Sequence, residues 1–297
     1  MNITQLLIQS KAPIKELSTE ELTALKGVLL DMFKDIYTAC QKHQLGVMLS
    51  GGSCLGAIRH NGFIPWDDDM DIMLLREDYN KLPNVLQKEY GNKYQCVGPN
   101  ISSHTDMSFM RIEKPGTTLR CIYDNPEEHK PIFMDVFPLD NIPDSRCIRY
   151  INSIIADGLQ YIGLCMKYYD HRRCPMVQAL KSFPAGKREI RRRLSIGKIC
   201  SIFTSYTNIF GTLDRFISRY SNKKTKDIGA LCSRRYLSEV YPRNSILPIR
   251  THTFEDIREA PVPNDYDRYL RTLYGDYMQL PPIEQRKHAF WTEIKFC

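Results

Sequence analysis

The chain has 297 residues, a formal net charge of +7 at pH 7, and 42% hydrophobic and 25% charged residues. This length allows one large or two modest domains, and the composition is that of an ordinary soluble globular protein. The most apolar stretch, 151–166, is short and is interrupted by polar residues, so it does not predict a membrane span.

The cysteines and the N-terminus predict a cytoplasmic protein. The ten cysteines are scattered and lack the close pairs of zinc-binding or redox motifs, so we expect reduced thiols that mostly pack in the core. The apolar run 6–8 is too short for a secretory signal, and Lys11 follows it.

The first predicted element is a helix over 19–44. Ser18 and Glu21 form a capping box before it, and apolar residues recur along it at helical spacing. We expect this helix to be scaffold.

A strand, a tight turn and a second helix are predicted next. Residues 47–49 are an apolar run, Gly51 and Gly52 permit a close backbone turn, and a helix over 53–60 would have Ser53 as its cap. The free N–H groups of such a helix start favour a phosphate, although a Gly-Gly-Ser turn alone more often closes a hairpin.

Three alternating aspartates, Asp67, Asp69 and Asp71, then lead into an apolar strand over 70–75. In an extended chain Asp69 and Asp71 project from the same face. Two carboxylates about 4 Å apart repel by roughly 4 kcal/mol at an effective dielectric of 20, so we expect a cation between them. Mg²⁺ suits such oxygen ligands, and Mn²⁺ is the alternative. The bland interpretation is a solvated acidic turn after Pro65.

A third carboxylate is expected from a neighbouring strand. Asp135 is the only polar residue in the apolar run 132–138, and a buried aspartate needs a partner. The alternative to a metal-site role is an ion pair with Arg111 or Arg120, or a turn cap. Asp140, just beyond this run, is predicted to be a turn residue.

Basic residues near these motifs are candidate phosphate ligands. Arg59 and His60 follow the glycine turn on its helix, and Arg111 and Lys114 lie on or near a predicted strand over 107–113. Arg59 could equally be solvated and His60 structural, while a paired charge at a strand edge is the favoured interpretation of the other two.

The remaining elements are predicted in chain order. A helix starts near Arg76 and is broken or restarted at Pro83, and strands follow over 119–123 and 132–137. Helices over 146–169 and 196–220 come after them, and the tyrosine-rich stretch 266–278 predicts a helix that packs on the core. Near the C-terminus three basic residues either contact phosphate or are solvated: Arg286, Lys287 and His288.

The positive charge is concentrated in one segment. Residues 167–198 hold ten Lys or Arg and two acidic residues, a balance of +8 that accounts for the net charge of the whole chain. A solvated helical face, attraction to an anionic inner membrane leaflet, and nucleic-acid binding are the three interpretations. We favour the first two together and expect no nucleic-acid partner, because aromatic residues are sparse there and no nucleic-acid module is evident.

These motifs carry a family resemblance. The pattern of Gly-Ser, an Asp-hydrophobic-Asp pair and a later strand aspartate resembles the nucleotidyltransferase superfamily. Residues 55–72 read Leu-Gly-Ala-Ile-Arg-His-Asn-Gly-Phe-Ile-Pro-Trp-Asp-Asp-Asp-Met-Asp-Ile and closely resemble the LicD family of phosphotransferases. Segments 133–140, 254–255, 262–267 and 273–278 support the resemblance.

The resemblance implies transfer of a phosphate-linked group, often phosphocholine from a cytidine diphosphate donor, to a hydroxyl of a cell-surface glycan or glycolipid. It implies that Asp69 and Asp71 are metal ligands, with Asp67 at the first acidic position and Asp135 as the third carboxylate. Gly52 and Ser53 would hold the donor phosphates.

We therefore predict an α+β fold with a nucleotidyltransferase-like small mixed sheet flanked by helices. Residues 1–145 would form the catalytic core, and 146–297 a helical, basic portion whose C-terminal segment packs back on the core. Metal-dependent transfer of a phospho-substituent is the predicted function, in the cytoplasm or peripherally at the inner face of the membrane. The alternatives are transfer of a nucleoside monophosphate, and a catalytically silent membrane- or nucleic-acid-binding protein.

Overall fold

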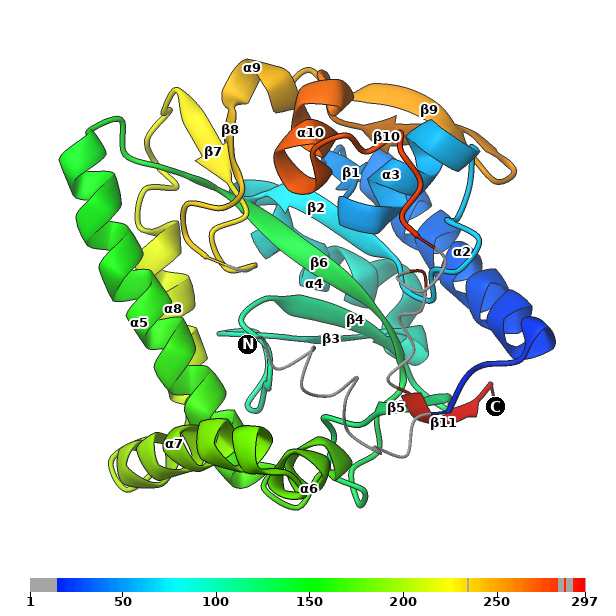
Figure 1. The fold of residues 1–297 in the computed structure, drawn as a ribbon. Coiled ribbons are helices and arrows are strands. Elements are labelled where there is room, and N and C mark those ends of the chain that lie inside the picture. The colour runs from blue at the N-terminus through cyan, green and yellow to red at the C-terminus, as the bar shows by residue number, and fades with distance from the viewer. Residues whose placement is uncertain (1–14, 234, 283–285, 287–290, 297) are drawn as a thin grey trace.

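A mixed β-sheet forms the centre of the protein. The computed structural model describes residues 15–233, 235–282, 286 and 291–296, and Figure 1 shows their arrangement. Among these residues the sheet has seven strands, of which five follow the order β1-β2-β6-β4-β3, while β7 joins β6 and β8 joins β7. Their bounds are β1 (Val47–Leu49), β2 (Asp71–Leu75), β3 (Gln95–Val97), β4 (Met110–Lys114), β6 (Ile132–Asn141), β7 (Asp227–Gly229) and β8 (Val240–Pro242).

Strand β6 organises this sheet. It pairs in parallel with β2 and antiparallel with β4, and its last residues pair antiparallel with β7. Two small antiparallel pairs lie outside this sheet: β9 (Arg250–Phe254) with β10 (Ile257–Val262), and β5 (Thr118–Cys121) with β11 (Trp291–Lys295). The mixed pairing, with helices around it, confirms the predicted α+β class with a small mixed sheet.

Helices α2 (Thr19–Lys42) and α4 (Arg76–Tyr90) pack against one face of the sheet. The predicted capping box of α2 is present, since the Ser18 side chain accepts from the Glu21 N–H and the Glu21 side chain accepts from the Ser18 N–H. The prediction that Pro83 breaks α4 is wrong, because the helix continues through it. Alternate residues of β6 on this face, such as Met134 and Val136, are fully buried, which leaves the opposite face for the site.

The segment after β6 is helical. It contains α5 (Arg146–Asp170), α6 (Pro175–Lys181), α7 (Pro184–Cys200) and α8 (Tyr206–Ser218). The predicted single helix over 196–220 is wrong: Ser205 caps a new helix by accepting from the N–H of Asn208. None of the helices in the described part of the chain combines the length and the apolar composition of a membrane span.

The C-terminal segment returns to the start of the sheet. Helices α3 (Gly51–His60) and α10 (Tyr266–Tyr274) lie near β1, and the short helix α9 (Arg243–Ile246) lies beside α10 and β8. A 3₁₀ turn spans Gly91–Lys93. Helix α10 packs on α3 and ends before Gly275, which has a φ of +69°, so the predicted helix over 266–278 is four residues too long. The division of the chain at residue 145 stays a prediction.

A buried ion-pair network joins the sheet to the helical segment. Arg76 at the start of α4 donates to both carboxylate oxygens of Asp140 (2.7 Å each) and to Asp214 of α8 (2.7 Å). The prediction that Asp140 is a turn residue is wrong, because β6 continues through it and its side chain is fully buried. Since a buried charge is tolerated only when it is paired, this network fixes α8 against the sheet.

Replacement of Asp140 tests this network. Asp140→Asn leaves Arg76 with one carboxylate fewer in a buried site, and we expect the free energy of unfolding to fall by about 3 kcal/mol. Urea denaturation followed by circular dichroism measures the change. Glu77→Gln is the control, because Glu77 pairs with Lys81 in solvent and should leave stability essentially unchanged. Equal stability of the two variants would contradict the structural role of the network.

Candidate active site

A cavity of about 880 Å³ lies on the side of the sheet opposite α2 and α4. Six of the residues predicted from sequence line it: Gly52, Arg59, Asp67, Asp69, Asp71 and Arg111. Aromatic residues from distant parts of the chain complete the wall: Trp66, Phe133, Tyr274, Tyr277 and Trp291. Six other predicted residues are not among the described residues that line the cavity, namely Gly51, Ser53, His60, Lys114, Asp135 and Arg286.

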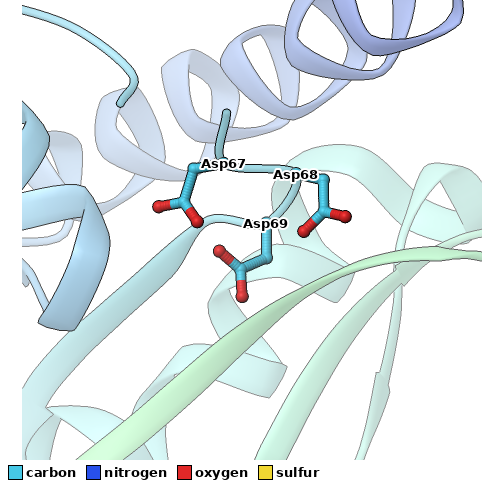
Figure 2. Close-up of side chains that lie close together, drawn as sticks. All are labelled: Asp67, Asp68 and Asp69. Carbon is cyan, nitrogen blue, oxygen red and sulfur yellow. The ribbon is translucent and has the colours of Figure 1, made fainter. Parts of the chain in front are cut away.

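An acidic loop between α3 and β2 forms one wall. One carboxylate oxygen from each of Asp67, Asp68 and Asp69 lies within 4.8 Å of the other two, and Figure 2 shows the three side chains on this loop. Lys26 of α2 holds the start of the loop by donating to the carbonyl oxygens of Ile64 and Pro65 (2.9 Å each). Asp68 was not selected from the sequence, although three consecutive aspartates were the signal for it.

Asp71 lies beside this loop as the first residue of β2. Asp69 lies two residues before the strand, and both carboxylates line the same cavity. The register places Asp71 opposite Asp135 of β6, which brings two predicted carboxylates together on adjacent strands. This contact depends on the parallel pairing of β2 with β6.

The glycine turn approaches these carboxylates closely. A Cβ atom at Gly51 would lie 3.0 Å from Asp71 Oδ2, and one at Gly52 would lie 2.7 Å from Asp67 Oδ2. Gly51 also has a φ of +48°, a conformation that side chains disfavour. The prediction that Ser53 caps the helix is wrong: α3 begins at Gly51, and Ser53 Oγ instead accepts from the Asp71 N–H (2.9 Å).

Tyr269 of α10 supports the turn from behind. Its buried hydroxyl oxygen accepts from the Gly51 N–H (2.9 Å) and lies 3.0 Å from Ser50 Oγ. The Gly51 N–H is therefore already used, and a phosphate at this helix start would meet the neighbouring Gly52, which lines the cavity. Sequence reasoning missed this role, because a tyrosine at helical spacing predicts core packing alone.

Crowding and burial shift the titration of the aspartates. Burial, followed by the charges of Asp69, Asp135 and Asp67, raises the pKa of Asp71 well above its usual value. Burial and the Asp68 charge raise the pKa of Asp67 to about 6, against the opposing effect of Lys26. Keeping Asp67 and Asp71 ionised in the folded protein therefore costs free energy, and a bound divalent cation would lower that cost. A set of carboxylate oxygens this close fits a hard cation such as Mg²⁺ or Mn²⁺.

Asp135 makes an ion pair at the edge of this cluster. Arg111 Nε of β4 donates to Asp135 Oδ1 (2.7 Å), and the guanidinium stacks 3.7 Å from the centre of the Phe133 ring. The alternative partner for Asp135 that the sequence offered is therefore present. The Asp135 carboxylate still contributes to the raised pKa of Asp71, so it belongs to the electrostatics of the site.

Basic residues on the cavity wall are held in place by neighbours. Arg59 donates through Nη1 to the carbonyl oxygen of Tyr277 (2.7 Å) and through Nε to Nε2 of His60 (3.0 Å). His60 thus supports Arg59, and burial together with the Arg59 charge lowers its pKa, which keeps it neutral near pH 7. Lys114 does not line the cavity.

The C-terminal segment also reaches the cluster. Trp291 Nε1 donates to Asp68 Oδ2 (2.5 Å), and the Arg286 guanidinium lies 4.8 Å from the centre of the Trp66 ring. Lys287 and His288 fall outside the described residues. Trp291 had no signal in the sequence, because its role depends on pairing between β11 and β5.

The fold and the site together define a nucleotidyltransferase-like α+β domain. Residues 44–146 match the family described as "LicD/FKTN/FKRP, nucleotidyltransferase domain". This match, over about a third of the chain, confirms the resemblance to the LicD family that the motifs predict.

The chain is similar to one known protein along nearly its whole length and to two others over a third or so of it. The lipopolysaccharide cholinephosphotransferase LicD of Haemophilus influenzae is 26% identical over 92% of this chain and 96% of its own length. Uncharacterized proteins of Rickettsia prowazekii and Rickettsia typhi are 27% and 38% identical over 39% and 30% of this chain, and over 40% and 29% of their own lengths. The prediction that the chain is an enzyme of the LicD type, a transferase, is confirmed by these findings together.

The raised pKa values predict how pH and a divalent cation affect stability. The pKa of Asp67 is about 6 in the folded protein, against an ordinary value of 3.8, because the folded state binds the proton more tightly. In the absence of metal, the contribution of Asp67 to stability is therefore present below pH 3.8 and should be lost as the pH rises through about 6. Mg²⁺ should therefore raise the melting temperature more at about pH 8 than at about pH 5, where protonation competes with it.

Thermal unfolding with and without MgCl₂ across this pH range measures the effect. Asp67→Asn removes the titrating group and should flatten both the pH dependence and the Mg²⁺ response. A melting temperature that Mg²⁺ leaves unchanged at every pH would contradict the interpretation of the acidic cluster as a metal site.

Proposed function

We propose that this protein transfers a phosphocholine-like group from a nucleotide diphosphate-activated donor, such as CDP-choline, to a hydroxyl of a lipopolysaccharide-type glycan. The observation that carries the proposal is the convergence of Asp67, Asp69 and Asp71 beside Gly52 in one cavity. The similarity to a cholinephosphotransferase along nearly the whole chain supports the transferred group and the acceptor class. We place the reaction in the cytoplasm.

The carboxylates would hold Mg²⁺ or Mn²⁺. Asp67, Asp69 and Asp71 would be its ligands, with Asp68 or Asp135 adjusting the charge, and the bound cation would neutralise the donor's pyrophosphate and the leaving nucleotide. Asp68 is already hydrogen-bonded to Trp291, which orients it toward the cluster.

The chain's own groups would position the donor. Transfer at phosphorus needs alignment and charge neutralisation more than covalent chemistry from the protein. The N–H of Gly52 and the guanidinium of Arg59 lie on the same wall as the aspartates, where they would contact phosphate oxygens. Asp135, opposite Asp71 on β6, would accept the proton of the acceptor hydroxyl, and the hydrogen bond from Arg111 would orient its carboxylate.

Two aspartate variants test the proposal. Asp69→Asn and Asp71→Asn should each lower turnover of CDP-choline at least about a hundredfold, because several kcal/mol of transition-state stabilisation are removed. Chromatography of the products measures turnover and identifies the leaving group. Asp256→Asn is the matched control, since Asp256 is exposed and pairs with Lys34. Wild-type turnover in both site variants would contradict the proposal.

The same assay separates the second candidate function. The matching domain is described as a nucleotidyltransferase domain, and the same carboxylates would serve transfer of the nucleoside monophosphate itself. Release of cytidine monophosphate from CDP-choline supports phosphocholine transfer. Release of pyrophosphate from a nucleoside triphosphate, with CDP-choline left intact, would support the alternative.

Replacement of Arg59 and replacement of His60 should differ in their effects on the KM for the donor. Arg59→Gln removes a charged contact to the donor and should raise its KM about 10- to 100-fold, since hydrogen bonds to charged groups contribute about 1.5–3 kcal/mol. His60→Gln keeps an acceptor for Arg59 and should change KM far less. Steady-state kinetics on folded variants measures both, and a larger effect at His60 would contradict the supporting role assigned to it.

A further inference from the structure

The helical segment 146–218 presents an unusual apolar surface. The structure has twelve exposed large hydrophobic residues among those it describes, and eight of them lie between residues 148 and 203. Scattered exposed hydrophobics are normal, but a concentration on one part of a chain marks an interaction surface. Four on α5 share one face at spacings of three, four and seven residues: Ile148, Ile151, Ile154 and Ile155, with exposures of 43 to 59%.

The second group lies at the end of α7 and in the turn after it. Ile199, Ile202 and Phe203 are 60, 74 and 82% exposed, the last two being the most exposed large hydrophobic side chains described. Residues that protrude this far from a turn between helices gain nothing from the protein's own core. Their exposure costs free energy in water, which contact with an apolar phase would recover.

Basic side chains share the outward face of α7 with this apolar end. Arg188, Arg191, Arg192 and Lys198 are all exposed and recur at helical spacing ahead of Ile199 and Ile202. Glu189, the acidic residue on this helix, is half-buried and paired with Arg192 (3.2 Å) and Arg193 (3.0 Å). The exposed face of α7 is therefore positively charged along most of its length and apolar at its C-terminal end.

Helices α5 and α7 form one packed unit. A Cβ at Gly197 would lie 2.1 Å from the carbonyl oxygen of Cys165, so α7 crosses α5 at close range, and Ile162 packs in the same apolar cluster as Cys200. Figure 1 shows α5, α7 and α8 along one side of the molecule, with α2 and the β9–β10 pair on the other. The apolar and basic groups thus sit on one helical layer outside the cavity.

We propose that this layer docks on the surface of an anionic lipid bilayer, with Ile202 and Phe203 inserted among the lipids and the arginines of α7 against acidic headgroups. The combination of apolar side chains with a positive face is that of helices that lie in a membrane interface. A protein partner would have to match both an apolar tip and a row of basic side chains, whereas an anionic bilayer provides both complements at once. The docking does not depend on the transfer reaction proposed above.

Vesicle flotation of the purified full-length chain tests this docking. The protein should float with vesicles rich in phosphatidylglycerol, remain unbound with vesicles of phosphatidylcholine alone, and lose binding as salt is raised. Ile202→Ser combined with Phe203→Ser should abolish flotation. Arg188→Gln, Arg191→Gln and Arg192→Gln should each lower the partition coefficient roughly fivefold.

Two controls keep the result specific. Met278→Ser removes an exposed methionine just after α10, and Arg258→Gln an exposed arginine on β10, both outside this layer, and neither should change flotation. Circular dichroism checks that every variant is folded. Failure of the wild-type chain to float with phosphatidylglycerol vesicles would overturn the proposal. So would a wild-type chain that binds no vesicles and is a dimer by light scattering, if the Ile202 and Phe203 changes convert that dimer to a monomer. Because flotation needs no turnover, an inactive enzyme that still floats would contradict the proposed reaction and leave the docking intact.

Discussion

Mutual repulsion of aspartates is the constraint around which this site is built. Three carboxylates on one loop have oxygens within 4.8 Å of one another, and Asp71 lies beside them at the start of β2. At an effective dielectric of 20 each such pair costs roughly 4 kcal/mol at about 4 Å, which is a large share of the stability of an ordinary domain. A fold that keeps this arrangement must offset the cost with a counter-charge, and Lys26 and Arg59 lower the pKa of Asp67 only in part. The account of function follows from the divalent cation that would complete the balance.

The fold holds the cluster together from four separate parts of the chain. Parallel pairing of β2 with β6 sets Asp71 opposite Asp135, and the glycine turn leaves room for the carboxylates because no side chain intervenes. Tyr269 fixes that turn from α10, and Trp291 reaches Asp68 from the last described strand. The C-terminal segment is therefore part of the site, and the similarity to the Haemophilus transferase along nearly the whole chain agrees with this arrangement.

Local signals were enough to predict the elements and the acidic motif, whereas long-range contacts were not. The capping box of α2, the strand before the glycine turn and the mixed α+β sheet could be read from spacing and composition. Asp140 was mistaken for a turn residue because nothing near it in sequence shows that Arg76, 64 residues away, would bury it. Ser53 looked like a helix cap but binds the Asp71 N–H, and the roles of Tyr269 and Trp291 depend on partners more than 200 residues distant. The sequence does not show that the isoleucines of α5 are exposed, since an apolar stripe on a helix ordinarily predicts a buried face.

Diffraction from a crystal soaked in Mn²⁺ tests the central claim most directly, because the ion's anomalous signal locates it without assumptions about the protein. The account predicts strong anomalous density among the carboxylates of Asp67, Asp69 and Asp71, on the cavity side of Gly52. A peak elsewhere in the protein would contradict the account. The absence of any peak, with lysine and arginine side chains neutralising these carboxylates instead, would also contradict it.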